Sequence, residues 1–372
     1  MKVAFRVDAS LQMGSGHFMR CLTLADALVA QGAQCHFISR QLSGNLIPTI
    51  EQRGFAVTTL PAPMPTAATA QCSGDNSGLR TVHADWLCID WQTDAAQTSA
   101  ALASQKPDWL VVDHYAIDQQ WESALRPHVK KLMVIDDLAD RPHNCDVLLD
   151  QNLGRQAQDY DSRVSEQCQL LIGPHYALLR PEFSALRPSS LQRRQHPKLR
   201  QLLITMGGVD QKNATGQVLQ ALQGCALSPD CGITVVMGLQ APWLEQVREQ
   251  AQRMSWPTEV LVNISDMAQR MADSDLAIGA AGSTSWERCC LGLPTFMVVL
   301  AENQRAIAEA LQGVGAAHTL DSATLAPEVC NAISTYVADT CELHAMSVSA
   351  ASIVDGLGVN RLVSYLAALE KF

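Results

Sequence analysis

The first group of residues with chemical potential is a short glycine loop that ends in a histidine. Gly14, Ser15 and Gly16 precede His17, and the apolar run before them ends at Asp8. Glycines let a backbone approach a ligand closely, and free N–H groups at a helix start favour an anion. The helix dipole disfavours an imidazolium there, so a neutral His17 is expected, as a general base requires. Position alone leaves open that His17 is only an exposed or packed helix residue.

More polar side chains follow predicted strands in the same half of the chain. Asp8 either holds a ring nitrogen of His17 or caps its own loop. Asp113, His114 and Tyr115 follow a second apolar run. Because ligands of open α/β sheets sit at the carboxyl ends of strands, these three residues are expected to face the same cleft. Each of them could instead be a turn residue or a helix cap.

The second half of the chain contains two glycine turns suited to a diphosphate. Gly207 and Gly208 follow a predicted strand, whereas Gly282, Ser283 and Thr284 join a strand to a helix. Small residues with hydroxyls at such a helix start favour phosphate oxygens. The alternative is an ordinary glycine-rich turn without a ligand.

Polar side chains next to these turns extend the predicted binding site. Glu287 lies about one turn inside the helix, where a carboxylate can accept both hydroxyls of a ribose. A solvent-facing glutamate is the alternative. Asn303 and Gln304 follow the strand at 295–300 and are expected beside the same site.

The elements that must position these residues alternate between short apolar runs and longer amphipathic stretches. This alternation predicts βαβ units and parallel sheets, that is, an α/β fold with two doubly wound domains. A break between Arg187 and Arg200, with two prolines, predicts the linker, so the domains are expected at 1–187 and 188–372. The segment 61–81 has no clear period and predicts a loop. The expected strands are 3–7, 35–39, 56–60, 109–112, 132–135, 147–149, 201–205, 234–237, 259–262, 276–278 and 295–300.

Composition narrows the classes of protein. The formal charge of −10, without a basic stretch, argues against a nucleic-acid partner. No apolar window is long enough to span a membrane, and the start carries no signal-peptide pattern, so a cytoplasmic chain is expected. The 12 cysteines are scattered and are expected to be reduced, mostly buried thiols. Neither they nor the histidines show metal-ligand spacing, which predicts no metal and no cofactor.

The ordered motifs resemble the nucleotide-sugar hydrolase family of pseudaminic acid biosynthesis, which acts in flagellin glycosylation. The likeness runs along nearly the whole chain. The motifs that carry it are Phe5 to Ser10, Gly14 to His17 with Arg20, Asp113-His114-Tyr115, Asp136-Asp137, Cys145-Asp146, Gly173 to Arg180, Met206-Gly207-Gly208 with Asp210, and Glu302-Asn303-Gln304.

The resemblance implies a GT-B fold, in which two Rossmann-like domains face a central cleft and the last helix crosses back to the first domain. It implies metal-independent hydrolysis of UDP-2,4-diacetamido-2,4,6-trideoxy-β-L-altrose to UDP and the free sugar, with inversion. His17 would be the base on water. Tyr115 would be a substrate-site residue with a catalytic part, and Glu287 would bind the ribose. Arg20 and Asn303 would be substrate-site residues. A monomer whose only partner is the UDP-sugar is expected.

Three other functions remain open at this level. A GT-B glycosyltransferase would pass the sugar to an acceptor instead of water. A hydrolysing 2-epimerase would invert C2. A non-catalytic nucleotide-sugar-binding accessory protein would retain the fold without turnover.

Overall fold

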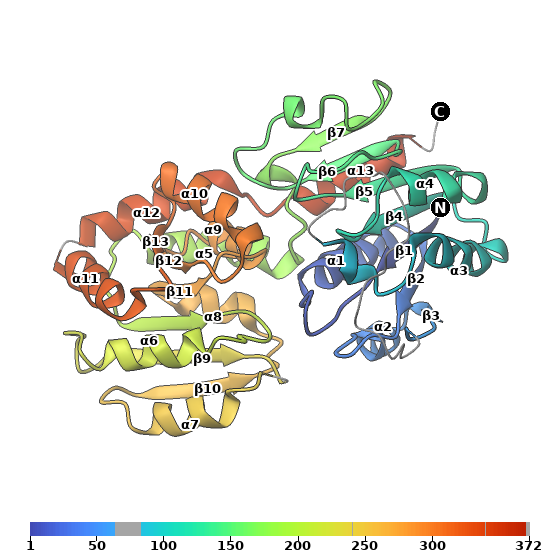
Figure 1. Cartoon of the computed structure of the whole chain (residues 1–372). Helices are drawn as coiled ribbons and strands as arrows, with labels where there is room; N and C mark the ends of the chain where they lie inside the picture. Colours follow the sequence, from blue (N-terminus) through green and yellow to red (C-terminus); the bar gives the residue numbers. More distant parts are fainter. Residues whose placement is uncertain (64–82, 240, 339, 370–372) are drawn as a thin grey trace. The chain divides into compact units, whose positions relative to one another are not determined.

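The computed structural model describes residues 1–63, 83–239, 241–338 and 340–369. The chain divides into two compact units (Figure 1). Unit 1 comprises residues 1–151 and 155–172 and the chain from 362 onward, and unit 2 comprises 152–154 and 173–361. The loop expected at 61–81 lies almost wholly outside the described residues, because the description stops at residue 63 and resumes at 83.

Unit 1 is built on one parallel sheet with the strand order β3-β2-β1-β4-β5-β6-β7. All five residues of β4 are buried, as expected for a parallel strand covered by helices on both faces. The strands are β1 (Lys2–Val7), β2 (Gln34–Arg40), β3 (Ala56–Leu60), β4 (Trp109–Asp113), β5 (Lys131–Ile135), β6 (Val147–Asp150) and β7 (Gln169–Ile172). The helices are α1 (Gly16–Ala30), α2 (Ile47–Gln52), α3 (Trp91–Ala103) and α4 (Gln119–Leu125).

Unit 2 contains a second parallel sheet, with the order β10-β9-β8-β11-β12-β13. Leu202 and Ile204 of β8 belong to one hydrophobic cluster and Leu203 to another, so both faces of the strand are covered. The strands are β8 (Gln201–Thr205), β9 (Gly232–Met237), β10 (Thr258–Val262), β11 (Leu276–Ala280), β12 (Thr295–Val298) and β13 (His318–Leu320).

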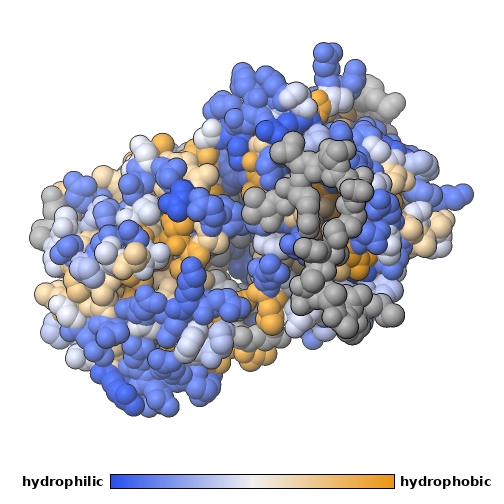
Figure 2. Space-filling model, viewed as in Figure 1, coloured by the Kyte–Doolittle hydropathy of each residue, from blue (hydrophilic) through white to orange (hydrophobic). Residues whose placement is uncertain are grey.

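The helices of unit 2 pack on this sheet through apolar faces. In α7, Val247 and Ala251 are buried while the opposite face is exposed. Figure 2 shows this outer surface as largely hydrophilic. The helices are α5 (Pro181–Arg193), α6 (Ala214–Leu222), α7 (Leu244–Gln252), α8 (Met267–Asp273), α9 (Thr284–Cys290), α10 (Arg305–Gly313), α11 (Leu325–Ala338), α12 (Thr340–Ile353) and α13 (Gly358–Leu369).

The first half of the segment expected to be the interdomain linker, as far as Arg193, is helical. Helix α5 continues through Pro188, although a proline inside a helix costs about 3 kcal/mol. Tertiary contacts offset this cost: Phe183 is buried, and Arg187 donates to the backbone oxygens of Cys290, Ala351 and Val354. The contact boundary between the units therefore lies at Gly173, not after Arg187. Helix α13 begins in unit 2 and continues into unit 1 from Leu362.

Each sheet has a switch point, where the chain turns from one sheet edge to the other. In unit 1 it lies between β1 and β4, and Val7 is the register partner of Asp113. In unit 2 it lies between β8 and β11. Loops leaving the two strands at a switch point diverge and open a crevice, which is where α/β sheets bind ligands. Most candidate residues of both units follow these strands, whereas Asn303 and Gln304 follow β12.

Candidate functional site

A tight turn delivers His17 to the switch point of unit 1. The backbone oxygen of Ser10 accepts the amide of Gly14 at 2.8 Å, and Ser10 Oγ accepts the amide of Met13 at 3.1 Å. Gly14 has a φ of +74°, a conformation that favours glycine. The turn ends at Ser15, which is exposed, and α1 begins at Gly16. His17 is thus the second residue of the helix, beside the end of β4.

Asp113 binds His17 through a short hydrogen bond. His17 Nδ1 lies 2.7 Å from Asp113 Oδ1, and the Asp113 side chain is fully buried. Burial alone would raise the pKa of Asp113, but the charge of Arg20 and the hydrogen bonds from Arg20 and His17 outweigh it and hold that pKa well below its usual range. An ionised carboxylate only accepts hydrogen bonds, so the contact with Asp113 favours the tautomer with the proton on Nδ1, in which Nε2 of a neutral ring has the free lone pair. Arg20 Nη2, a donor, lies 3.2 Å from the same Nδ1. The His17 side chain is 11% exposed.

Arg20 connects Asp113 to a second acid. Its Nε and Nη2 donate to the two oxygens of Asp113 at 2.6 and 2.7 Å, a bidentate arrangement. Its Nη1 lies 3.0 Å from Asp137 Oδ1. His17 and Arg20 are three residues apart in α1, so they share one helix face. The sequence-predicted residues His17, Arg20 and Asp113 therefore form one contact network.

Tyr115 is seated next to this network by aromatic contacts. Its hydroxyl donates to Asp137 Oδ2 at 2.8 Å, and its ring meets that of His17 edge-on, with centroids 4.3 Å apart. Trp86 stacks on Tyr115 at 5.5 Å and 21°, and His83 lies 5.2 Å from the same ring. Sequence reasoning missed Trp86 and His83, because they lie in a short 3₁₀ segment without a motif.

Asp8 does not contact His17 and has a different structural role. It is fully buried and accepts two hydrogen bonds from Arg6, at 2.6 and 2.9 Å, and one from the amide of Arg40 at 2.7 Å. Burial would raise the pKa of Asp8, but Arg6 and then His114 hold it below the usual range. The partner of the His17 ring is Asp113, so the expectation that Asp8 holds this ring is wrong. The pairing of β1 with β4 explains this difference. Asp113 is the last residue of β4 and contacts α1, whereas Asp8, which follows β1, is bound by Arg6 and Arg40.

His114 is also a buried framework residue. Its Nδ1 accepts the amide of Ala116 at 3.1 Å, and its Nε2 lies 3.4 Å from Asp8 Oδ2 without hydrogen-bond geometry. Burial lowers the pKa of His114, so its neutral form is favoured. Its 3% exposure leaves little surface for a substrate.

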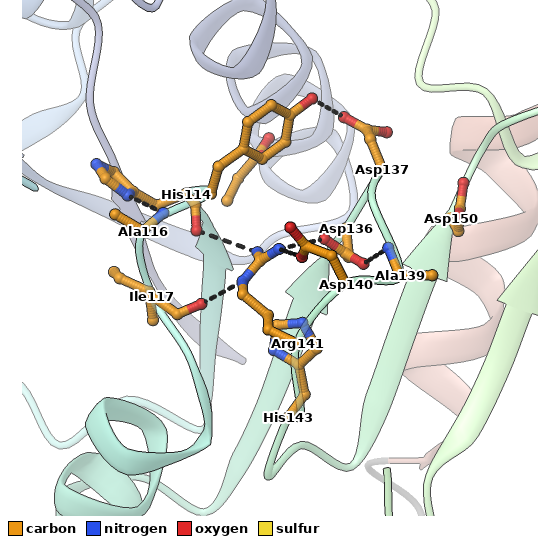
Figure 3. A network of polar contacts seen from close by, with 12 residues as sticks. His114, Ala116, Ile117, Asp136, Asp137, Ala139, Asp140, Arg141, His143 and Asp150 are labelled. Carbon is orange, nitrogen blue, oxygen red and sulfur yellow. Dashed lines mark hydrogen bonds and ion pairs between the residues drawn. The ribbon is translucent and has the colours of Figure 1, made fainter. Parts of the chain in front are cut away.

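Arg141 joins the loops after β4 and β5, as Figure 3 shows. It donates to the backbone oxygen of Ile117 at 2.7 Å and to Asp136 at 2.9 Å. Asp136 in turn accepts the amide of Ala139 at 2.7 Å. This buried support fixes the loop that carries Asp137. No motif in the sequence indicated that Arg141 would support this loop.

Two glycine turns follow the strands at the switch point of unit 2, one at 207–208 after β8 and a second at 281–284 after β11. Gly207 has a φ of +86°, and a Cβ placed on Gly238, which follows β9, would overlap the backbone oxygen of Gly208, so the first turn packs against the backbone after β9. A Cβ on Gly282 would meet no atom within 4 Å. Ser283 is exposed and Thr284 opens α9. The backbone of this second turn is therefore accessible.

Glu287 lies on α9 behind these turns, with its side chain 18% exposed. Burial raises its pKa to about 6, and the opposing charges of Arg180 and Arg288 reduce that shift. Arg180 Nη2 lies 3.9 Å from Glu287 Oε1. A carboxylate with this pKa changes charge near pH 6.

The residues after β12 differ from each other. Gln304 Oε1 accepts the amide of Leu300 at 3.0 Å, which fixes the loop, whereas Asn303 is exposed.

Within the described ranges no helix is long and apolar enough to cross a membrane. In the same part of the chain no three His, Cys, Asp or Glu side chains cluster as metal ligands.

Comparison with known proteins defines the fold class. Residues 201–356 match the glycosyltransferase family 28 C-terminal domain. The structure of MurG from Acinetobacter baumannii superposes with a TM-score of 0.68 at 15% identity, over 99% of both chains. A Phytolacca americana UGT2 complexed with UDP-2fluoro-glucose and pterostilbene gives 0.69 at 12% identity, over 100% of both chains. The chain has a GT-B fold.

The sequence relatives share more identity with this chain than these structures do, and their descriptions differ from one another. The chain is 26% identical to the UDP-2,4-diacetamido-2,4,6-trideoxy-beta-L-altropyranose hydrolase of Campylobacter jejuni, over 83% of this chain and 95% of that protein. It is 27% identical to an uncharacterized protein of Methanocaldococcus jannaschii over 82% of this chain, and 31% identical to the spore coat polysaccharide biosynthesis protein SpsG of Bacillus subtilis over 46%. These two matches span 56% and 50% of the relatives, about half their length. The matches relate this GT-B chain to nucleotide-sugar enzymes.

Proposed function

We propose that the chain hydrolyses UDP-2,4-diacetamido-2,4,6-trideoxy-β-L-altrose to UDP and the free sugar. The observation that carries this proposal is the hydrogen bond of 2.7 Å between His17 and a buried, ionised Asp113. It presents the Nε2 lone pair of a neutral imidazole as a general base. The likeness to the Campylobacter hydrolase over most of both chains supports the choice of substrate.

The reaction in this proposal is a single displacement by water. A water oxygen attacks the anomeric carbon while His17 Nε2 accepts a proton. The bond from that carbon to the β-phosphate oxygen breaks, its electron pair leaves with UDP, and the configuration inverts. Asp113 stabilises the imidazolium formed. In this proposal Tyr115, whose hydroxyl donates to Asp137 at 2.8 Å, contacts the sugar.

Unit 2 supplies the UDP-binding residues in this proposal. The accessible backbone at Gly207, Gly208 and 282–284 receives the diphosphate, as oriented N–H groups bind anions. Glu287 accepts the ribose hydroxyls. Asn303 and Gln304 line the same sheet edge, and the departing diphosphate is stabilised by preorganised donors.

The pH dependence of uridine binding tests the role of Glu287. Its pKa is about 6 in the free protein, and ribose hydroxyls bind the charged form more strongly. Uridine affinity should therefore be full above pH 7 and fall roughly tenfold toward pH 5, as Glu287 takes up a proton. Uridine itself does not titrate there. Calorimetry on Glu287→Gln should give a weak, pH-independent affinity; a pH-dependent loss that persists in this variant would contradict the assignment.

Removal of the aromatic support of Tyr115 should have a moderate effect. An aromatic pair contributes about 0.5–1.5 kcal/mol, so Trp86→Ala should lower kcat/KM roughly 3- to 10-fold. Trp86→Phe keeps a stacked ring and should recover most of the loss. Trp243→Ala in unit 2, whose indole only donates to the backbone of Gln211, is the matched control. Equal losses in Trp86→Ala and Trp243→Ala would count against a role at the site.

Incubation of the purified chain with the UDP-sugar alone tests the reaction. NMR should show UDP and the free diacetamido sugar, inverted at the anomeric carbon and unchanged at C2. Release only with an added acceptor would identify a glycosyltransferase, and inversion at C2 a hydrolysing epimerase. Binding without turnover would identify an accessory protein. Each of these results excludes the proposed hydrolysis.

A further inference from the structure

Arg288 is a buried cation that forms no ion pair among the described residues, and the adjacent Glu287 is the carboxylate whose charge acts on it. Its side chain is 1% exposed, and it follows Glu287 in α9. Its Nη2 donates to the backbone oxygen of Ala280 at 2.7 Å and lies 3.1 Å from Ser285 Oγ, but Nε and Nη1 have no hydrogen-bond partner. Among the residues that the structure describes, no carboxylate forms an ion pair with it. A buried charge in this state is costly to the fold.

A second buried arginine of unit 2 shows what a purely structural arginine looks like. Arg194 is 4% exposed, and burial lowers its pKa to about 10, as it does for Arg288. Its two terminal nitrogens, however, donate to five oxygens, which are the backbone oxygens of Ser190, Met271, Ala272 and Ser274 and the hydroxyl of Ser190. These bonds tie α5 to the end of α8. Arg288 makes only the two contacts named above among the described residues, so a role in tying helices together, as for Arg194, does not explain why a charged side chain is buried here.

The position of Arg288 relates that charge to the open turn of unit 2. A Cβ on Gly279 would overlap Arg288 Nη1, so the missing side chain makes room for the guanidinium beneath β11. From Ala280, which Arg288 holds, the chain continues directly into 281–283. One short segment therefore contains both Gly282, whose backbone is accessible, and Ala280, whose backbone oxygen accepts a hydrogen bond from the buried Arg288. An anion bound at the turn would add a second countercharge to that of Glu287.

We propose that Arg288 is a positioning residue for the diphosphate: it acts through the turn at 281–283, holds that turn by Ala280, and attracts the anion without touching it. This inference rests on the proposed binding of UDP by unit 2. In the weakly screened interior one charge acts over several ångströms, and its effect grows with the charge of the ligand. A role in packing alone has no such dependence on ligand charge.

The test compares UDP, UMP and uridine as ligands in calorimetry on the full-length chain. Arg288→Met, measured at pH 8 where Glu287 stays charged, should raise the Kd of UDP about 10- to 50-fold, raise that of UMP less, and leave that of uridine within about twofold. Arg288→Lys retains the charge and should stay within about threefold of the parent at pH 6.5, where a buried lysine keeps its proton better. Arg194→Lys is the matched control and should leave all three Kd values unchanged.

The possible outcomes separate the explanations. Equal weakening of UDP and uridine in Arg288→Met would show a packing role and overturn the inference, as would an unchanged UDP affinity. If Arg288→Met does not fold, Arg288→Lys read at pH 6.5 and 8 decides, because UDP affinity should fall as the lysine loses its proton and should not fall in the parent. If the parent binds uridine and UDP equally, the inference about Arg288 fails but the proposed function stands. If it binds neither, the proposed function fails as well.

Discussion

Substitution of His17 by alanine should lower kcat for UDP-sugar hydrolysis by about 10²- to 10⁴-fold, the usual contribution of a general base. The effect should fall on kcat, because the binding residues assigned to UDP belong to unit 2. Loss of His17 removes the acceptor for the proton of water while the leaving group stays as good as before. Single-turnover measurements with the UDP-sugar give the chemical step directly.

The variant needs controls for folding and for ligand binding. His17→Ala should bind UDP with the affinity of the parent and unfold at a similar temperature. His128→Ala, which removes an exposed histidine of unit 1 whose Nε2 lies 2.8 Å from Ser99 Oγ, should retain full activity. A His17→Ala protein that turns over at the parent rate would refute the mechanism, even if the reaction itself is hydrolysis.

The second large effect is expected for Asp113→Asn. The amide of asparagine can donate to Nδ1, which would stabilise the tautomer with its proton on Nε2, the wrong atom for a base. It also offers no charge to the imidazolium. We expect kcat to fall by roughly 10²- to 10⁴-fold, as when the carboxylate of other His–Asp pairs is neutralised.

Asp113→Asn should also destabilise the fold, which His17→Ala should not. The guanidinium of Arg20, 6% exposed, loses its bidentate partner and keeps only Asp137. Breaking a buried ion pair costs about 3–5 kcal/mol, so a lower free energy of unfolding by urea is expected. Asp146→Asn, which breaks the more exposed pair with Arg126, is the control and should leave kcat intact. Parent-like turnover in Asp113→Asn would exclude Asp113 as the orienting group.

The secondary structure was largely predictable from the chain itself. Apolar runs such as 109–112 and 201–205 are strands because buried parallel strands need apolar side chains on both faces. The short edge strands β7 and β13 were missed: four and three residues give too little pattern to detect. Helix α5 was mistaken for a linker, because Pro188 is a strong local signal whose cost only tertiary contacts offset.

The sequence by itself determined which residue types stand after which strands: a histidine behind a glycine turn, an acid at the end of β4, and accessible glycines in the second half. These features follow from local patterns of two to seven residues. Only the tertiary structure decided that Asp113 and not Asp8 binds His17, since this depends on the register of β1 against β4 and on which acids Arg6 and Arg20 neutralise. Likewise, only packing shows that Trp86 seats Tyr115 and that Arg288 is buried unpaired, because both depend on residues that the chain brings together from separate elements.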